Sequence, residues 1–497
     1  MYAWGFPYIL NQCRDAIYRV STYMSVPYAI ARSVPIYNQK SSGTFAIAND
    51  KENLTVKLLC LSNGHGEDAI AVRILRQLQQ QPQPPEIVAL PLVGDGLAYK
   101  NLESVRIIGP MKRMPSGGFI YMDGQQLWGD LQNGLLKLTW EQIKVIRAWS
   151  ADRSAEENKA ILAVGDIVPL LFARVSGLNY GFVGTAKSEY YLRDEVGLLP
   201  RQSWFERLES WSGSVYLPWE RALMGHKRCK GVFPRDSLTA TTLQKFSIPA
   251  FDLGNPMMDE LEVKNPSAIF FDPNAEFKES QRPLVVVLLP GSRSPEAYEN
   301  WEMIMAGVAD LLKHYGDRPV GLLGAIAPGL DLAPLLKVLQ TYGWSPQPMT
   351  PSSSATWSGI QDSNALHLRK KNTSLILTQQ SFVNCLQNAD LAIAMAGTAT
   401  EQFVGLGKPA IAIPGNGPQF TPAFAEAQSR LLGASLILVK RPSQVGAAVE
   451  QLFRDPDRLD LITQNGRRRM GEPGAAHRIA NCLMDRFALN YQQSTKT

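Results

Sequence analysis

Short apolar runs alternate with amphipathic stretches along most of the chain after residue 55. VKLLCLS (56–62) and EIVALPLVG (86–94) are apolar enough to be buried strands, whereas EDAIAVRILRQLQQQ (67–81) repeats its apolar positions at helical spacing. Further strand-like runs are AILAVGD (160–166), NYGFVG (179–184) and CKGVFPRD (229–236). Strands that alternate with helices predict an α/β domain built on a parallel sheet.

A second series of the same kind begins at LVVVLLPGSRSPEAYEN (284–300), an apolar strand that runs into a turn and a helix. It continues with PVGLLGAI (319–326), SLILTQQ (374–380), ADLAIAM (389–395) and PAIAIPG (409–415). The polar stretch 350–374 between two of these strands is expected to be an exposed insertion. A Gly-Asn-Pro break in FDLGNPMMDEL (251–261), followed by polar sequence, indicates a boundary between the two series.

The pattern therefore predicts two α/β domains with added segments, which suits a chain of 497 residues. We expect an N-terminal extension at 1–54, a first Rossmann-like domain at 55–255, a linker at 256–283, a second Rossmann-like domain at 284–440 and C-terminal helices at 441–497. The extension lacks the features of a secretory signal, and its sequence is compatible with an interfacial amphipathic helix or with a poorly ordered segment.

Two turns of the second domain have the composition of an anion site. In LLPGSRS, Gly291 allows a close backbone approach, Ser292 offers a hydroxyl group and Arg293 a bidentate, permanently charged contact. In AGTATEQ, Gly397 permits a tight turn before Ala399, while Thr398 and Thr400 can cap a helix and bind phosphate oxygens. Ligands of parallel sheets bind beyond the carboxyl ends of the strands, where helix N-termini attract anions. Gly, Ser and Thr at these positions are also common in ordinary helix caps.

These segments carry a family resemblance. LPGSR, AGTATEQFVGLGKPAIAIPG and GVFPRDSLTATTLQKFSIPAFDLGNPMMDEL resemble segments of bacterial lipid-A-disaccharide synthase and, more loosely, of other GT-B glycosyltransferases. The best match is to the group of proteins related to that synthase, over about residues 55 to 440. The resemblance implies two Rossmann-like domains that face each other across a cleft. It also implies a UDP-sugar donor in the second domain, an acceptor in the first, and inverting transfer without a metal or other cofactor. Arg293 and the turn 397–400 would stabilise the departing UDP.

One departure from the family concerns the donor's ribose. Family members commonly carry a glutamate after GTAT that accepts bonds from the ribose hydroxyls. Counting from Gly397, this position falls on Gln402, and Glu401 lies one residue earlier, about 100° around the helix. Gln402 can still bond a hydroxyl group, but UDP specificity is open. Gln419, in GNGPQFTPAF, lies in a loop that contacts the donor in GT-B relatives, or it is a surface glutamine.

The first domain has a glycine-rich turn, SNGHGED, after its first strand. The spacing of Gly64, Gly66 and Ala69 fits a dinucleotide fingerprint, but the acidic first helical turn would repel a pyrophosphate. In GT-B relatives the corresponding turn faces the acceptor, so we assign the acceptor side to Asn63, Gly64, Gly66 and Glu67. His65 could act as general base because its ordinary pKa is near neutrality, or it could have a structural role.

Asp166, at the end of the apolar strand AILAVGD, is the other candidate base. A carboxylate at the carboxyl end of a strand can take a proton or bind a sugar hydroxyl, although it can also be a helix N-cap. The segment approximately matches an Asp-x-Pro segment of lipid-A-disaccharide synthase. It has one extra residue before Pro169, and Leu170 stands where the family has a second aspartate.

Charge and composition narrow the choice of partners. The formal charge of +5 is dispersed, so nucleic acid is not expected, while an anionic membrane surface or a phosphorylated substrate remains compatible. Five scattered cysteines without a CxxC motif indicate a reducing, cytoplasmic setting. No apolar run reaches the roughly 20 residues of a membrane span. The aromatic and basic residues of 203–230 suit a lipid headgroup region, so a lipid or glycolipid acceptor at the inner membrane face is expected.

Four functions remain open at this stage. The first is a GT-B glycosyltransferase, and the second is a nucleotide-sugar 2-epimerase, which uses the same scaffold without an acceptor. The third is an NAD(P) oxidoreductase that uses the turn at Gly64 and Gly66. The fourth is a non-catalytic protein that binds nucleotide sugars, a reading favoured by the altered segment at Glu401 and Gln402. No motif in the sequence identifies the oligomeric state, the sugar or the acceptor.

Overall fold

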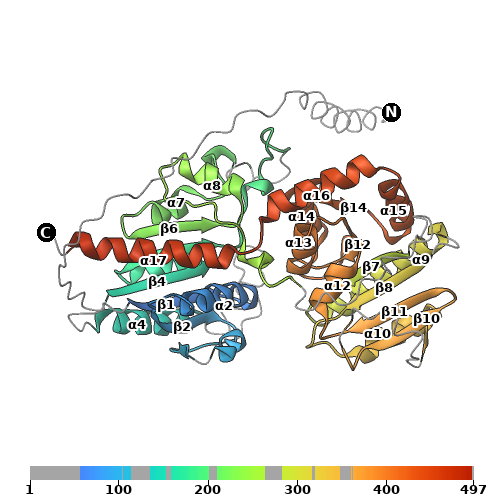
Figure 1. The fold of residues 1–497 in the computed structure, drawn as a ribbon, viewed down its shortest axis with the longest axis horizontal. Helices are drawn as coiled ribbons and strands as arrows, with labels where there is room; N and C mark the ends of the chain where they lie inside the picture. Colours follow the sequence, from blue (N-terminus) through green and yellow to red (C-terminus); the bar gives the residue numbers. More distant parts are fainter. Residues whose placement is uncertain are drawn as a thin grey trace, which may run out of the picture. The chain divides into compact units, whose positions relative to one another are not determined.

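The computed structural model describes residues 56–102, 104–112, 135–152, 158–200, 207, 210–262, 283–315, 319–347, 360 and 362–494. The predicted extension 1–54 lies outside these ranges. The described residues form two sheets, each with helices packed against it (Figure 1).

The first sheet is parallel throughout and has the order β3-β2-β1-β4-β5-β6. Its strands are β1 (Val56–Asn63), β2 (Glu86–Val93), β3 (Arg106–Ile107), β4 (Asn158–Gly165), β5 (Asn179–Gly184) and β6 (Cys229–Pro234). Its helices are α2 (His65–Gln79), α4 (Leu135–Ala151), α5 (Ile167–Val175), α7 (Pro218–Met224) and α8 (Ser237–Gln244). In β1, Leu58 and Cys60 join one buried cluster and Leu59 and Leu61 another. Both faces of the sheet are therefore covered, which explains why its strands read as unbroken apolar runs.

The second sheet has the order β14-β13-β12-β7-β8-β11-β10-β9. Its strands are β7 (Leu284–Leu289), β8 (Val320–Ala325), β9 (Ser345–Pro346), β10 (Leu366–Lys370), β11 (Thr373–Thr378), β12 (Leu391–Ala394), β13 (Ala410–Ala412) and β14 (Leu436–Leu438). The helices that follow them include α9 (Glu296–Tyr315), α10 (Leu332–Thr341), α12 (Phe382–Asn388), α13 (Thr398–Gly405), α14 (Pro422–Leu432), α15 (Val445–Phe453) and α16 (Pro456–Met470).

One edge of the second sheet differs from the expectation. Strand β10 pairs with β11 and with β9 in the antiparallel sense, so part of the expected insertion 350–374 belongs to the sheet. The connection is a tight hairpin in which Lys371 has a φ of 52°. Residues of β10 are mostly half-exposed, and a half-exposed edge strand has too few apolar positions to be recognised as a strand.

The last helix, α17 (Ala475–Ser494), packs against α2 and β6 of the first domain, as Figure 1 shows. A side chain added at Gly181 of β5 would collide with Leu483 of this helix, because the Cβ position lies 2.6 Å from Leu483 Cδ2. The chain therefore returns to its first domain after completing the second.

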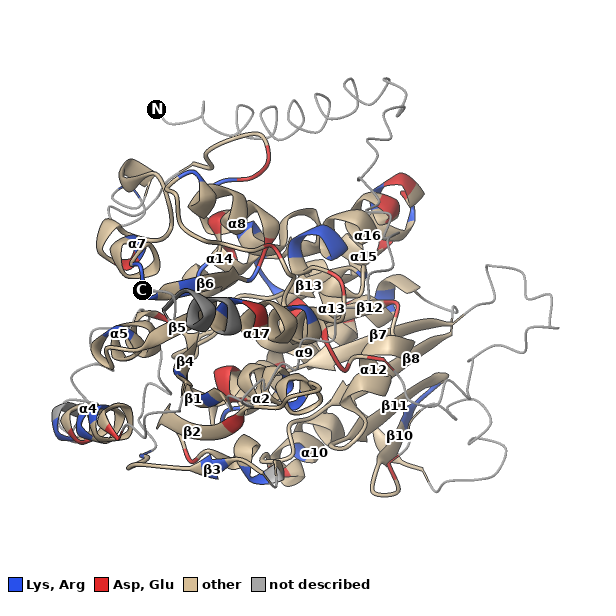
Figure 2. Ribbon diagram, turned by 60° about the vertical axis from the view of Figure 1, so that its left-hand side comes forward, with Lys and Arg blue, Asp and Glu red and all other residues tan. Residues whose placement is uncertain are grey.

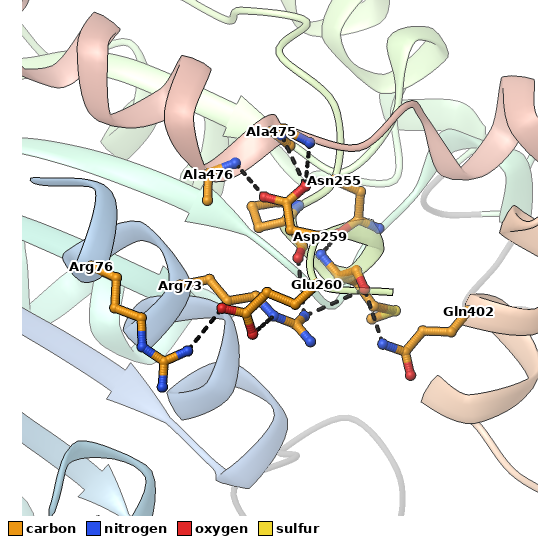
Figure 3. Close-up of polar contacts among 11 residues, drawn as sticks. Arg73, Arg76, Asn255, Asp259, Glu260, Gln402, Ala475 and Ala476 are labelled. Atoms are coloured by element: carbon orange, nitrogen blue, oxygen red, sulfur yellow. Dashed lines mark hydrogen bonds and ion pairs between the residues drawn. The ribbon is translucent and has the colours of Figure 1, made fainter. Parts of the chain in front are cut away.

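A short linker around the helical turn η3 (Pro256–Met258) contacts α2, α17 and the second domain (Figure 3). Arg73 of α2 donates to the carbonyl groups of Pro256 and Met257 at 3.0 and 3.3 Å. Asp259 accepts hydrogen bonds from the first-turn amides of α17. Glu260 pairs with Arg73 and Arg76 at the surface, where such pairs add little stability. The GNPMMDE sequence is thus a junction between α2, α17 and the second domain.

Charged residues are interspersed along both domains. In Figure 2, Lys and Arg positions and Asp and Glu positions are both found on elements of the two domains. Among the described helices, none is long and apolar enough to span a membrane.

Candidate active site

The two turns with anion-site composition lie next to each other. Strands β7 and β12 are direct neighbours, so the turns that follow them leave the same edge of the sheet. The buried amide of Asn300 in α9 donates to Pro290 O at 3.0 Å and to Met395 O at 3.3 Å, which ties the turns together. Gly291 has a φ of 98°, and its Cβ position would lie 3.3 Å from Met395 O. A glycine is therefore required there by both the backbone conformation and the close approach.

A third loop joins these two turns through α9. The buried carboxylate of Glu296 accepts hydrogen bonds from the backbone amides of Gln419 and Phe420, at 3.1 and 2.6 Å. Gln428 of α14 donates to Ala396 O and Gly397 O at 3.1 and 3.2 Å. Buried polar side chains thus fix the three loops at the carboxyl end of the sheet, in the place where α/β proteins bind anions.

The predicted donor residues differ in their access to this place. Ser292, Arg293 and Thr398 are exposed, whereas Gly291, Gly397, Ala399 and Gln419 are half-buried. Arg293 is exposed as a residue, but its guanidinium group is partly buried, and this burial lowers its pKa. The negative charges of Glu296 and Glu67 act in the opposite direction and raise the pKa. The first amides of α13 have no acceptor within the helix and can bind an anion.

The expected capping by threonine is wrong. Helix α13 begins at Thr398 with Gly397 as its N-cap, and no side chain caps it. Thr400 is completely buried, and its hydroxyl group donates to Ala396 O at 2.5 Å. Thr400 therefore supports the turn from beneath, because in the third helical position its hydroxyl group reaches back to the carbonyl group four residues earlier. It has no exposed group with which to contact a phosphate.

Glu401 and Gln402 both make bonds within the protein. Glu401 Oε2 pairs with Arg235 Nη2 at the end of β6, at 2.5 Å, and both side chains are buried. Gln402 Nε2 donates to Met257 O of the linker at 3.0 Å (Figure 3). Contact with the donor's ribose remains a prediction for these residues, and the bonds observed give them a role in joining the two domains. The sequence contained no sign of this pairing, because Arg235 lies 166 residues from Glu401.

In the first domain, Asn63 and Asp166 lie together at the ends of β1 and β4. Asn63 Nδ2 donates to Asp166 Oδ1 at 2.9 Å, and the same oxygen accepts the Val168 amide, so Asp166 is indeed the N-cap of α5. Burial raises the pKa of Asp166 to about 6. Such a carboxylate is stronger as a base than a solvated one and is still ionised near neutral pH. The capping role and a catalytic role are compatible.

The glycine turn and the first turn of α2 hold two candidate site residues, one exposed and one buried. His65 and Gly66 are exposed, and Gly64 has a φ of 129°, which favours glycine. Glu67 is buried; its Oε1 accepts a hydrogen bond from Thr185 at 3.2 Å. Burial raises the pKa of Glu67 to about 7, and the charge of Asp166 contributes to the rise. The first turn of α2 thus holds a buried acid at Glu67, and the sequence, which assigned this residue to the acceptor side, did not indicate its burial.

Sequence reasoning missed a narrow pocket beside Asp166. It is too tight to admit a water molecule and is lined by Asp166, Lys187, Tyr216 and Glu220 together with apolar side chains. Lys187 Nζ and Glu220 Oε2 form a buried ion pair at 2.8 Å. Neither residue belongs to a motif, so only the fold could bring them to Asp166. The pocket offers polar groups and apolar walls next to a candidate base.

The buried Glu67 predicts a pH-dependent effect on stability. The unfolded chain releases the glutamate proton near pH 4.5 and the folded chain near pH 7, so stability contributed by this group falls as the pH rises between these values. Glu67→Gln removes this loss. We compare the free energies of unfolding of the variant and the wild type, measured by urea unfolding. Their difference should shift in favour of the variant by about 2–3 kcal/mol when the pH is raised from 5 to 8. Glu426→Gln, at a partly exposed site on α14, is the control and should show no such trend. A Glu67→Gln difference that is the same at both pH values would contradict the assignment.

No protein-family model matches the sequence, and no curated protein matches it either. Solved structures do match. A predicted UDP-N-acetylglucosamine 2-epimerase from Listeria monocytogenes aligns with 87% of this chain and 97% of its own, with a TM-score of 0.50 and 14% identity. The calicheamicin glycosyltransferase CalG4 aligns with 87% of this chain and 98% of its own, with a TM-score of 0.50 and 12% identity. UGT71G1 of Medicago truncatula, whose structure was solved with UDP-glucose, aligns with 88% of this chain and 100% of its own, with a TM-score of 0.50 and 12% identity.

These likenesses confirm the predicted fold class. The chain has an α/β fold of the GT-B type, with two Rossmann-like domains built on parallel sheets. Its structural neighbours include glycosyltransferases and UDP-N-acetylglucosamine 2-epimerases. The relation to lipid-A-disaccharide synthase stays a prediction from the sequence.

Proposed function

We propose that this protein is an inverting glycosyltransferase that moves a hexosyl group from a UDP-sugar to a lipid or glycolipid hydroxyl group, as the resemblance to lipid-A-disaccharide synthase implies. The observation that carries the proposal is the convergence of three loops on Glu296 and Asn300 of α9. They surround helix amides and Arg293, which suit a diphosphate group. In the other domain, Asp166 at the carboxyl end of β4 supplies the base.

The proposed reaction is a single displacement. Asp166 takes the proton of the acceptor hydroxyl group while its oxygen forms a bond to C1 of the sugar. The bond between C1 and the β-phosphate oxygen breaks, and its electron pair leaves with UDP. Arg293 and the first amides of α13 stabilise the charge that develops on the diphosphate, so no metal or other cofactor is required. His65, exposed in the glycine turn, is the second candidate for the base.

A lipid acceptor is supported by helix α7. Its inner side contributes Glu220 and Met224 to the pocket at Asp166, while Trp219 is 54% exposed. Trp211, shortly before the helix, is 82% exposed. Exposed tryptophan residues suit the headgroup region of a membrane, so we propose peripheral association with the inner membrane face. The start of the aromatic segment, including Trp204 and Phe205, lies outside the described residues.

An epimerase is the alternative that a specific observation favours. Glu67 and Asp166 are two buried carboxyl groups with pKa values raised mainly by burial, and the charge of Asp166 adds to the rise at Glu67. Such a pair could serve acid and base steps on one sugar. Incubation of the protein with UDP-N-acetylglucosamine or UDP-glucose, with and without bacterial membrane lipid, separates the functions. A glycosylated lipid supports the transferase, an altered sugar without lipid supports the epimerase, and binding without turnover supports a non-catalytic protein.

Arg293→Ala tests the donor site directly. Loss of a charge-assisted contact to the diphosphate should weaken UDP binding about thirtyfold or more, measured by isothermal titration calorimetry. Arg454→Ala is a matched control, because Arg454 is exposed just after the end of α15 and pairs only with Glu450 among the described residues. Unchanged affinity in Arg293→Ala would reject the assignment of this residue. Failure of the wild type to bind UDP would reject the proposed function itself.

A further inference from the structure

Glu67 has a carboxyl oxygen that no group of the described protein satisfies. The side chain is buried, with 6% of the residue exposed, and Oε1 accepts the hydroxyl group of Thr185. Oε2 is also buried but has no hydrogen-bond partner among the described residues. An unsatisfied buried carboxyl oxygen is costly for folding, so its presence calls for an explanation such as a functional role or a bound partner.

The position of Glu67 indicates which ligand could complete it. Glu67 covers Gly165, next to Asp166, since a Cβ at Gly165 would lie 3.3 Å from Glu67 Cγ. Its charge also acts on Arg293 in the turn after β7. Glu67 therefore contacts the residue next to the candidate base and is near enough to Arg293 for its charge to act on that side chain.

A series of polar contacts links Glu67 to the donor helix of the second domain. Thr185 donates to Glu67, and Thr185 O accepts from Arg235 Nη1 at 3.2 Å. The other terminal nitrogen of Arg235 pairs with Glu401 at 2.5 Å. The side chains of Arg235 and Glu401 are 6% and 10% exposed, so solvent screens this ion pair little. Glu401 thus restrains Arg235. Arg235 in turn holds the carbonyl group of Thr185, and the hydroxyl group of Thr185 donates to Glu67.

We propose that Glu67 accepts a hydrogen bond from a hydroxyl group of the donor's sugar, and that Glu401 is a positioning residue that holds Glu67 through Arg235 and Thr185. The proposal rests on the proposed function, because it needs a nucleotide sugar bound at the second domain. It gives Glu401 a part in sugar recognition without a contact to the ribose.

The test compares the binding of UDP with that of UDP-glucose and UDP-N-acetylglucosamine. Calorimetry on the full chain at about pH 8, where Glu67 is mostly ionised, gives the ratio of the UDP dissociation constant to that of each sugar nucleotide. The charged groups around Glu67 are Asp68 on its own helix, Asp166 before α5 and Arg293. For the better-bound sugar nucleotide, the ratio should fall about tenfold in Glu67→Gln and about threefold in Glu401→Gln and Thr185→Val. UDP itself should bind within about twofold of the wild type in all three variants.

Glu426→Gln removes the same charge as Glu401→Gln from another helix of the second domain and should behave as the wild type. A ratio that is unchanged in Glu67→Gln and in Glu67→Ala overturns the proposal, as does a wild-type ratio of one for both sugars. Weaker binding of UDP in Glu401→Gln with an unchanged ratio would mean that Glu401 contacts the nucleotide, which overturns its positioning role. Absence of UDP binding in the wild type overturns the proposed function and this inference together.

Discussion

Replacement of Asp166 by asparagine should lower turnover by about two to four orders of magnitude, the usual contribution of a general base. Asparagine has nearly the same shape, and its Oδ1 can still accept the Val168 amide and the Asn63 side chain. The fold and the cap of α5 should therefore survive, and UDP affinity should stay within about twofold of the wild type. The measurement is the initial rate of glycolipid formation, with UDP binding measured in parallel.

The pH dependence of turnover is a second test of the role of Asp166. Because burial raises the pKa of Asp166 to about 6, wild-type turnover should increase as the pH rises through this value and the base becomes ionised. The Asp166→Asn variant should lack this limb. His65→Ala is the comparison that separates the two candidate bases. Full turnover in Asp166→Asn together with loss of turnover in His65→Ala would transfer the role of base to His65.

Loss of the Asp259 carboxylate should destabilise the protein by about 3–5 kcal/mol, as expected when a buried charged acceptor is removed and several donors lose their partner. Asp259 is buried and accepts the backbone amides of Gly474 and Ala475 with Oδ1, at 2.6 and 3.0 Å, and that of Ala476 with Oδ2, at 2.7 Å. These groups lie at the positive end of the α17 dipole, so the negative charge adds to the effect. Figure 3 shows the carboxylate between the linker and the helix.

Urea unfolding of Asp259→Ala and Asp259→Asn measures this contribution. The asparagine variant should lose less stability, because it keeps one acceptor oxygen. Asp460→Ala, at an exposed position of α16, controls for loss of an acidic side chain and should change the free energy of unfolding by at most about 0.5 kcal/mol. Hydrogen exchange of the α17 amides should accelerate in the Asp259 variants. Equal stability of Asp259→Ala and Asp460→Ala would contradict this account.

The elements of the fold that could be predicted are those determined by local sequence. The strand VKLLCLS was placed at 56–62 and is observed at Val56–Asn63, because a parallel strand buried on both faces is apolar throughout. The composition of the LPGSR and GTAT turns was recognisable in the sequence, but their adjacency depends on the strand order, since turns after neighbouring parallel strands share one edge. The half-exposed hairpin strand β10 was not recognised, because its pattern is that of a polar loop.

The candidate site was predictable only where a motif marks it. Gly291 and Asp166 stand in turns whose composition reveals their positions, so the sequence was sufficient to select them. The partners of Glu67 and Glu401 were not accessible in this way, because Thr185 and Arg235 approach them from distant parts of the chain. Burial of Glu67, and with it the raised pKa, is likewise a property of the assembled domains. The resemblance to GT-B relatives assigned this residue to the acceptor side without the contacts that define its chemistry.

The return of α17 to the first domain determines how the protein can be divided. A fragment that ends at the linker would lack Leu483, which fills the space above Gly181, and would leave part of α2 and β6 uncovered. A fragment that starts at β7 would carry α17 as an amphipathic helix without the surface that it covers. Expression of the halves as separate polypeptides should therefore give insoluble material. A polypeptide that contains the first half with α17 attached ahead of β1 would be the form in which this half could be purified alone.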